Sequence, residues 1–193
     1  MTKERLVAFT DAVLAIIMTI LVLELEKPET ASFEAFWALR QNFFAYTLSF
    51  FWLASLWIGL NTIWEKVSKV SSAVIWWNMI LLFFASFIPY ATNLVSKNFG
   101  SRTMQGFYGI IVIVMTATNY VLHLVIDAPN KDNKELLVAT AAYRKLLLPD
   151  ILIKVAGLIL SLIFYPPLMM LSVLVAAVFI ITGKHISESE NNR

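Results

Sequence analysis

The most informative segment of the chain is Arg5-Leu6-Val7-Ala8-Phe9-Thr10-Asp11, followed by the apolar run from Ala12 to Leu23. An arginine and an aspartate stand at the start of a segment that is otherwise typical of a membrane helix. Charged side chains in such a helix cost a few kcal/mol each on insertion scales, so they usually face a partner or a water-filled path. The stretch therefore predicts a first membrane span with charged groups that need polar partners.

Helical geometry gives this span two distinct faces. At about 100° per residue, one narrow stripe carries Phe9, Ala12, Ile16, Ile20 and Leu23. Thr19 lies about 60° to one side of Ile16, and Asp11 lies about 140° away from it. From the residues alone, the simplest interpretation of the stripe is a helix-packing or lipid-facing surface.

The composition of the whole chain is that of a membrane protein. Of its 193 residues, 59% are hydrophobic and 15% are charged, and the mean hydropathy is +0.74. A typical soluble domain has about 25% charged residues. The chain contains no cysteine, which excludes disulfides, thiolate metal sites and cysteine nucleophiles.

The apolar runs predict an all-α membrane protein with a single six-helix transmembrane domain, residues 1–193. We expect spans at about residues 5–25, 43–65, 72–95, 104–126, 147–165 and 168–183. Ser32 to Arg40 should lie at the membrane interface, and Pro89 should kink the third span or end its regular part. The polar stretch from Asp127 to Arg144 is expected to be the longest connection, and residues 184–193 a polar cytoplasmic tail without regular structure.

The distribution of lysine and arginine predicts that both termini are cytoplasmic. With that orientation, eleven of these residues are inside: Lys3, Arg5, Lys66, Lys69, Lys131, Lys134, Arg144, Lys145, Lys154, Lys184 and Arg193. Four are outside: Lys27, Arg40, Lys97 and Arg102. We therefore expect a multi-pass protein of the bacterial inner membrane.

Arg5-x-x-x-Phe9-Thr10-Asp11 resembles the Arg-x-x-x-Phe-Ser-Asp signature of the transmembrane protein 175 family, the potassium-permeable channels of bacteria and lysosomes. Thr10 replaces the usual serine, one hydroxyl for another. The resemblance continues along the second and third spans, in Ser49-Phe50, Trp57, Asn61, Asn78, Leu81-Leu82-Phe83-Phe84, Ser86-Phe87 and Pro89. Thr62 stands where many relatives have histidine, so no role is carried over for that histidine.

The resemblance implies a homotetramer of six-helix subunits in which the first helix lines the pore. Ile16 matches the residue that forms the pore constriction in the family, and Ile20 and Leu23 would continue the gate along the same stripe. A ring of branched side chains blocks ions by excluding water, as a hydrophobic gate. Thr19 would place hydroxyls beyond Ile16 and contribute with it to selectivity, or would bond back to its own helix. Both interpretations of Thr19 stay open.

Asp11 and Arg5 also allow two interpretations. They could face the ion path, or they could tie the first span to the second and third. Because Asp11 points away from the Ile16 stripe, we favour the second interpretation. The expected structural motif comprises Arg5, Phe9, Thr10, Asp11, Asn61 and Asn78, with a tryptophan N–H as a further possible partner.

Two further pairs stand four residues apart and therefore on one helix face. Asn119 and His123 could relay protons, but hydrogen bonding across helices is the simpler interpretation. Asp150 and Lys154 are expected to form an ion pair at the inner end of the fifth span.

The sequence lacks the motifs that are typical of several other functional classes. We find no catalytic constellation, no metal-ligand cluster, no phosphate-binding loop and no nucleic-acid-binding pattern, so we expect neither an enzyme nor a resident cofactor. A Thr-Val-Gly-Tyr-Gly filter loop is also absent. The sequence predicts a channel permeable to K+ and other monovalent cations, with the bilayer and further copies of itself as partners. The alternatives are a secondary transporter that couples protons through Asp11 or His123, and a structural membrane protein.

Overall fold

The computed structural model describes the backbone of residues 1–191 and the side chains of residues 1–183. Every regular element in this part of the chain is a helix, as predicted. In chain order they are α1 (Lys3–Leu23), α2 (Phe33–Ala38), α3 (Arg40–Trp64), α4 (Ser72–Ser86), α5 (Ile88–Lys97), α6 (Arg102–Asp127), the 3₁₀ turn η1 (Ala128–Asn130), α7 (Lys134–Ile163) and α8 (Leu168–Asn191).

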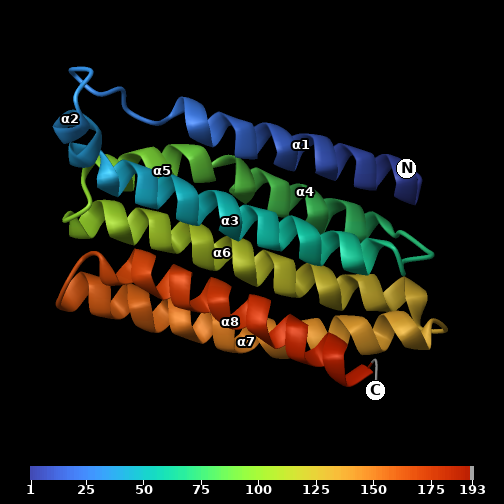
Figure 1. The fold of residues 1–193 in the computed structure, drawn as a ribbon. Coiled ribbons are helices and arrows are strands. Elements are labelled where there is room, and N and C mark those ends of the chain that lie inside the picture. The colour runs from blue at the N-terminus through green and yellow to red at the C-terminus, as the bar shows by residue number, and fades with distance from the viewer. Residues whose placement is uncertain (192–193) are drawn as a thin grey trace.

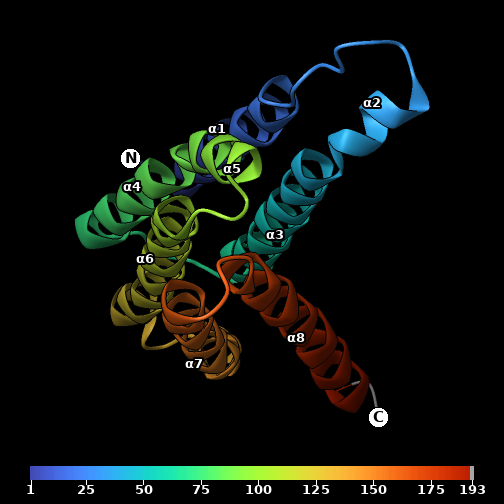
Figure 2. The same ribbon diagram turned by 90° about the vertical axis from the view of Figure 1, so that its left-hand side faces the viewer.

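The long helices lie side by side in one bundle and run alternately in opposite directions (Figure 1). In the described part of the chain, five helical stretches are long and apolar enough to cross a membrane, and Leu168–Gly183 of α8 is a shorter apolar segment. The start of α1, the α3–α4 connection and η1 lie at one end of the bundle, whereas α2 and the α7–α8 connection lie at the other (Figure 1). Figure 2 shows α1 on the opposite side of the bundle from α7 and α8.

Polar residues that accept backbone hydrogen bonds mark where several helices begin. The side chains of Thr2, Ser71, Ser101 and Asn133 accept from backbone N–H groups in the first turns of α1, α4, α6 and α7. Such caps satisfy amide groups that have no partner inside the helix. The first span thus begins close to the position expected from the sequence.

The third predicted span is interrupted near Pro89, as expected. α4 ends at Ser86 and α5 begins at Ile88, with Phe87 between them and Pro89 in the first turn of α5. Proline has no N–H and is tolerated in the first turn of a helix, where that group would lack a partner. The prediction that the regular part of this span ends there is confirmed.

The fifth span begins much earlier than the sequence suggested. α7 starts at Lys134 rather than near residue 147, so most of the expected polar connection is helical. Asn133 caps the helix, and apolar or small residues interleave with the charged ones between Lys134 and Arg144. Pro149 lies inside α7 without ending it. Charge density was therefore a poor guide to the end of the connection.

The expected tail at residues 184–193 is also corrected. The backbone of α8 stays helical through Asn191, and only residues 192–193 fall outside the described backbone. After Gly183 the sequence contains no further glycine or proline, the two residues least favourable in a helix. No strong helix-breaking residue therefore follows Gly183.

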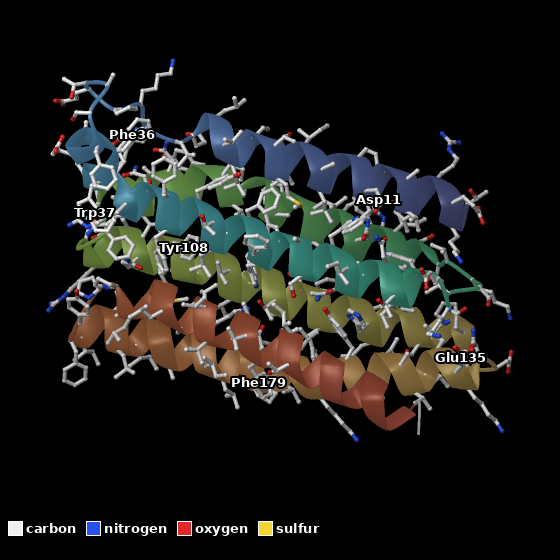
Figure 3. The ribbon with its side chains drawn as sticks, in the orientation of Figure 1. Asp11, Phe36, Trp37, Tyr108, Glu135 and Phe179 are labelled. Carbon is white, nitrogen blue, oxygen red and sulfur yellow. The ribbon has the colours of Figure 1, made fainter. Side chains whose placement is uncertain are left out.

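At the end of the bundle where α1 begins, a cluster of amide hydrogen bonds joins the α3–α4 connection to the α6–α7 connection. Asn130 is buried, and its Oδ1 accepts from the backbone N–H groups of Ser68 and Lys69 at 3.2 and 2.8 Å. Its Nδ2 donates to the carbonyl oxygen of Lys69, and Asn133 Nδ2 donates to that of Lys66. Beside them Lys66 pairs with Glu135, which Figure 3 shows at this end of the bundle. The first three spans are thus fastened to the last three.

The short helix α2 occupies the opposite end. Ser32 caps it, and its three aromatic side chains, Phe33, Phe36 and Trp37, are exposed. Figure 3 shows Phe36 and Trp37 at the end of the bundle, beside the start of α3. Aromatic rings are enriched at membrane–water interfaces, which agrees with the interfacial position expected for residues 32–40.

Candidate functional site

α1 has one face packed against the bundle and one face that the chain leaves uncovered. The packed face carries its buried residues, which are Leu6, Thr10, Leu14, Ile17 and Leu21. The other face carries Phe9, Ala12, Ile16, Ile20 and Leu23, all exposed. Ile16 is 58% exposed, Ile20 is 37% exposed and Leu23 is 78% exposed. In the described part of the chain, no other helix covers the stripe identified in the sequence.

Thr19 is exposed beside this stripe. Its hydroxyl donates to the carbonyl oxygen of Ile16 at 2.8 Å, within the same helix. This is the local bond that the sequence left open as one interpretation. The bond uses the only hydroxyl hydrogen, so the Thr19 oxygen presents its lone pairs to the uncovered side as an acceptor. The two interpretations are therefore compatible.

Asp11 lies off the stripe and is bonded to the second span. Trp57 Nε1 of α3 donates to Asp11 Oδ1 at 2.9 Å. Figure 3 shows Asp11 on the side of α1 that faces the bundle. Thr10, which precedes Asp11, is bonded to the third span. Asn78 Nδ2 of α4 donates to Thr10 Oγ1 at 2.8 Å, and both residues are buried. α1 is therefore held to α3 and α4 by consecutive residues.

The remaining residues of the expected motif take other positions. The Arg5 side chain is exposed, and among the described residues it forms no hydrogen bond or ion pair. Asn61 is half-buried and lines an open groove together with Asp11 and Trp64, without bonding Asp11. Phe9 lies on the uncovered stripe. The structure thus brings together Thr10, Asp11 and Asn78, and leaves Arg5 apart from them.

A second attachment, which sequence analysis did not predict, holds the chain just after the C-terminal end of α1. Asn93 Nδ2 of α5 donates to the backbone oxygen of Glu24 at 3.0 Å and to its Oε2 at 2.7 Å. Lys97 pairs with Glu26 at 3.6 Å. Both pairs join residues about 70 positions apart along the chain, so only the folded arrangement reveals them. α1 is thus held near its middle at Thr10 and Asp11 and just beyond its last residue at Glu24, while the Ile16 face stays exposed.

The two polar pairs further along the chain do not form a site with α1. His123 Nδ1 bonds to the backbone oxygen of Asn119 at 2.7 Å, and its ring stacks on Tyr143. This bond lies within α6, whereas the stacking on Tyr143 and a hydrogen bond from Arg144 Nη1 to the His123 backbone oxygen at 3.2 Å join α6 to α7. In the described part of the chain, no group of three or more His, Cys, Asp or Glu side chains could hold a metal ion.

The Asp150–Lys154 ion pair exists, but its expected position was wrong. Lys154 Nζ donates to Asp150 Oδ2 at 2.7 Å, and the side chains are 0% and 1% exposed, respectively. Because α7 begins at Lys134, the pair lies near the middle of that helix rather than at its inner end. Lys154 therefore does not belong among the loop residues that orient the chain. Without Lys154, the orientation predicted from the sequence rests on ten lysines and arginines against four, and the predicted bias remains.

These features define an all-helical, multi-pass membrane protein with an uncovered aliphatic face on its first helix. A sequence profile described as "Endosomal/lysosomal potassium channel TMEM175" matches residues 5–89. A protein from Chryseobacterium sp. (strain P1-3), named a potassium channel, is 34% identical over 190 residues, which is 98% of each chain. The chain belongs to the TMEM175 family, a family of potassium channels and not of enzymes.

Two further comparisons agree with this assignment. A second protein named a potassium channel, from Chamaesiphon minutus, is 30% identical over 99 residues, covering 48% of this chain and 49% of that protein. The fold is similar to the crystal structure of a TMEM175 homologue from Chamaesiphon minutus, titled a lysosomal potassium-selective channel homologue. The TM-score is 0.77 at 24% identity, with 96% of this chain and 97% of that chain covered. The whole bundle therefore has the TMEM175 fold.

Proposed function

We propose that this protein is a potassium-permeable cation channel formed by four copies of the chain, with α1 of each copy lining a central pore. The observation that carries the proposal is the uncovered stripe of Ile16, Ile20 and Leu23 on a helix that polar bonds hold near its middle and just beyond its C-terminal end. The chain belongs to the TMEM175 family and its relatives are named potassium channels, so we propose potassium as the permeant ion. Four such stripes around an axis would form an apolar tube.

The gate of this channel is a hydrophobic ring with Ile16 at its narrowest point. Branched aliphatic side chains in a narrow tube exclude water and so block ions without any charge. Ile20 lies about one helical turn further along the same stripe and would form a second ring. Leu23, the most exposed of the three, would form the outer end of the gate.

Selectivity in this proposal comes from α1 itself. The sequence has no carbonyl filter loop, so the ring of Ile16 and the neighbouring hydroxyl oxygens of Thr19 are the groups that meet the ion. A hydroxyl oxygen can replace part of the water around a monovalent cation. With one such layer beside an apolar ring, we expect a preference for potassium that is weaker than that of channels with a carbonyl filter.

The direction of insertion belongs to the same proposal. The lysines and arginines of loops and helix ends gather mainly where α1 begins, so this end faces the cytoplasm of a bacterial cell. α2, with its exposed aromatic side chains, then lies at the outer interface. Glu24 follows the gate, and its carboxylate would add a negative charge at the outer mouth that attracts cations.

Flux measurements on Ile16→Asn test the proposal. An amide ring should admit water, raise conduction above that of the wild-type protein and reduce the preference for potassium. Ile159→Asn is the matched control, since Ile159 of α7 is 51% exposed and belongs to no proposed ring. A folded tetrameric Ile16→Asn protein that conducts no more than wild type would reject Ile16 as the gate. In planar bilayers, single-channel steps indicate a channel, whereas slow saturable flux would favour a transporter.

A further inference from the structure

A small polar cavity lies in the second half of the bundle, away from α1. Its walls come from α3, α6, α7 and α8, and its polar lining includes Ser55, Thr116, Asn119 and Asp150. Of these, Thr116, Asn119 and Asp150 are buried, and Ser55 is half-buried. A polar cavity inside an otherwise apolar bundle is costly unless its groups are hydrogen-bonded.

Two buried oxygen atoms at this cavity receive no hydrogen bond from any described residue. They are Asp150 Oδ1 and Asn119 Oδ1, in residues that are each 1% exposed. Leaving a buried acceptor without a donor costs about 1–3 kcal/mol, and more for a charged group. Among the described residues the Ser55 hydroxyl has no hydrogen-bond partner either, so a donor group lines the same cavity.

The other oxygen of Asp150 is fully engaged. Lys154 Nζ donates to Asp150 Oδ2 at 2.7 Å and to Thr116 Oγ1 at 3.0 Å, and it lies 5.0 Å from the ring centroid of Trp52. The carboxylate charge is therefore already balanced by an ammonium group. The ligand that Asp150 Oδ1 and Asn119 Oδ1 require is a neutral hydrogen-bond donor.

The volume of the cavity indicates which hydrogen-bond donor fits in it. The room available to the centre of a water molecule is about 20 Å³. One water needs roughly 10–15 Å³ of such room and two to four polar partners. We propose that one water molecule binds here, donates to Asp150 Oδ1 and Asn119 Oδ1, and accepts from the Ser55 hydroxyl.

This water would join three helices at a single point. Ser55 belongs to α3, Asn119 to α6 and Asp150 to α7, so the first half of the chain meets the second half there. A monovalent cation is the competing occupant, because it also seeks oxygen atoms. It would sit close to the Lys154 ammonium, and two like charges in a low-dielectric interior repel strongly.

X-ray radiolytic labelling read by mass spectrometry tests the site, because radicals formed from a bound water oxidise the side chains beside it. Met115 lines the cavity and Met170 does not, yet both are 0% exposed. We expect Met115 of the purified protein to be oxidised several-fold faster than Met170. Equal rates would show that no water is bound, and the proposal would fail.

Two variants and one soak complete the design. Asn119→Leu removes an acceptor and fills the cavity, so it should lower the Met115 rate to that of Met170. Thr118→Val is the matched control, because among the described residues the Thr118 hydroxyl bonds only to Val114 of its own helix, and it should leave the ratio unchanged. If Asn119→Leu does not fold, the wild-type ratio still decides. If crystals soaked in a thallium salt showed an anomalous peak in the cavity, the occupant would be a cation rather than water, and the proposal would be overturned.

Discussion

Trp57 Nε1 lies 2.9 Å from Asp11 Oδ1, which fixes how α1 is rotated against α3. Asp11 is about 140° around the helix from Ile16, so a bond that turns the carboxylate toward α3 turns Ile16 away from the bundle. The Asn78–Thr10 bond reinforces the same rotation from α4. The exposure of the Ile16 stripe is therefore a consequence of polar contacts on the opposite side of α1.

The first prediction concerns this bond. Trp57→Phe removes the donor, and Asp11→Asn removes the charge that strengthens the bond. Hydrogen bonds to charged groups contribute roughly 1.5–3 kcal/mol, and the half-buried position of Asp11 favours the lower end. Thermal unfolding of the purified variants should show lower stability, while the ratio of potassium to sodium permeability stays close to that of the wild type.

Thr62→Val provides the control for this pair. Thr62 is exposed on α3, and within the described part of the chain its hydroxyl bonds only to the carbonyl oxygen of Ile58, so its loss should change little. If Asp11→Asn assembled normally and changed ion preference sharply, the carboxylate would belong to the ion path after all.

Much of this arrangement could be predicted from the sequence, because long apolar runs and helical periodicity are local signals. The uncovered stripe of α1 and the break near Pro89 follow from such signals. The start of α7 does not, since charged residues between Lys134 and Arg144 look the same in a loop and in a polar helical turn. The cap at Asn133 was the signal that could have placed it.

The hydrogen-bond partners of the polar residues could not be predicted from the sequence. A sequence shows that Asp11 needs a donor but not which of several tryptophans supplies it, because that depends on the rotation of two helices. The same holds for Asn93 and Glu24, and for the buried place of Lys154. The rule that lysine marks the cytoplasmic end applies only to loops and helix ends, so it should not have been applied to Lys154, which is buried inside α7.

The second prediction concerns the buried ion pair. Lys154→Met leaves Asp150 charged and without its partner, which typically costs about 3–5 kcal/mol. The double variant Asp150→Leu, Lys154→Met removes both charges and should be far less destabilised than the single variant. Thermal unfolding in detergent measures the difference. A double variant as unstable as Lys154→Met would mean that the pair is not held mainly by its two charges.

The third prediction concerns topology and uses the absence of cysteine from the chain. Thr30→Cys in the α1–α2 connection and Ser68→Cys in the α3–α4 connection each introduce one thiol at an exposed position, and these two connections lie at opposite ends of the bundle (Figure 1). With α1 beginning in the cytoplasm, a membrane-impermeant maleimide added to intact spheroplasts should label Thr30→Cys and leave Ser68→Cys unlabelled until the membrane is opened. The reverse pattern would place the start of α1 outside.

The last prediction separates the faces of α1 and concerns Ile20 and Ile17. Ile20→Asn should wet the second ring and raise conduction, but less than Ile16→Asn, because the narrower ring still limits water. Ile17 is 4% exposed on the packed face, so an amide there would be buried without a partner. Ile17→Asn should therefore reduce the yield of folded tetramer without producing a leak.

Conduction and yield, measured on all three variants in liposomes of one composition, provide the comparison. If the stripe lines the pore, the ion leak should be largest in Ile16→Asn and smaller in Ile20→Asn. Ile17→Asn should show no leak, because Ile17 lies on the packed face. If α1 merely faced lipid, the two exposed variants would lose stability and gain no flux. A leak at Ile17 equal to that at Ile16 would mean that α1 is rotated in the assembled channel, and that the Trp57–Asp11 bond does not hold it there.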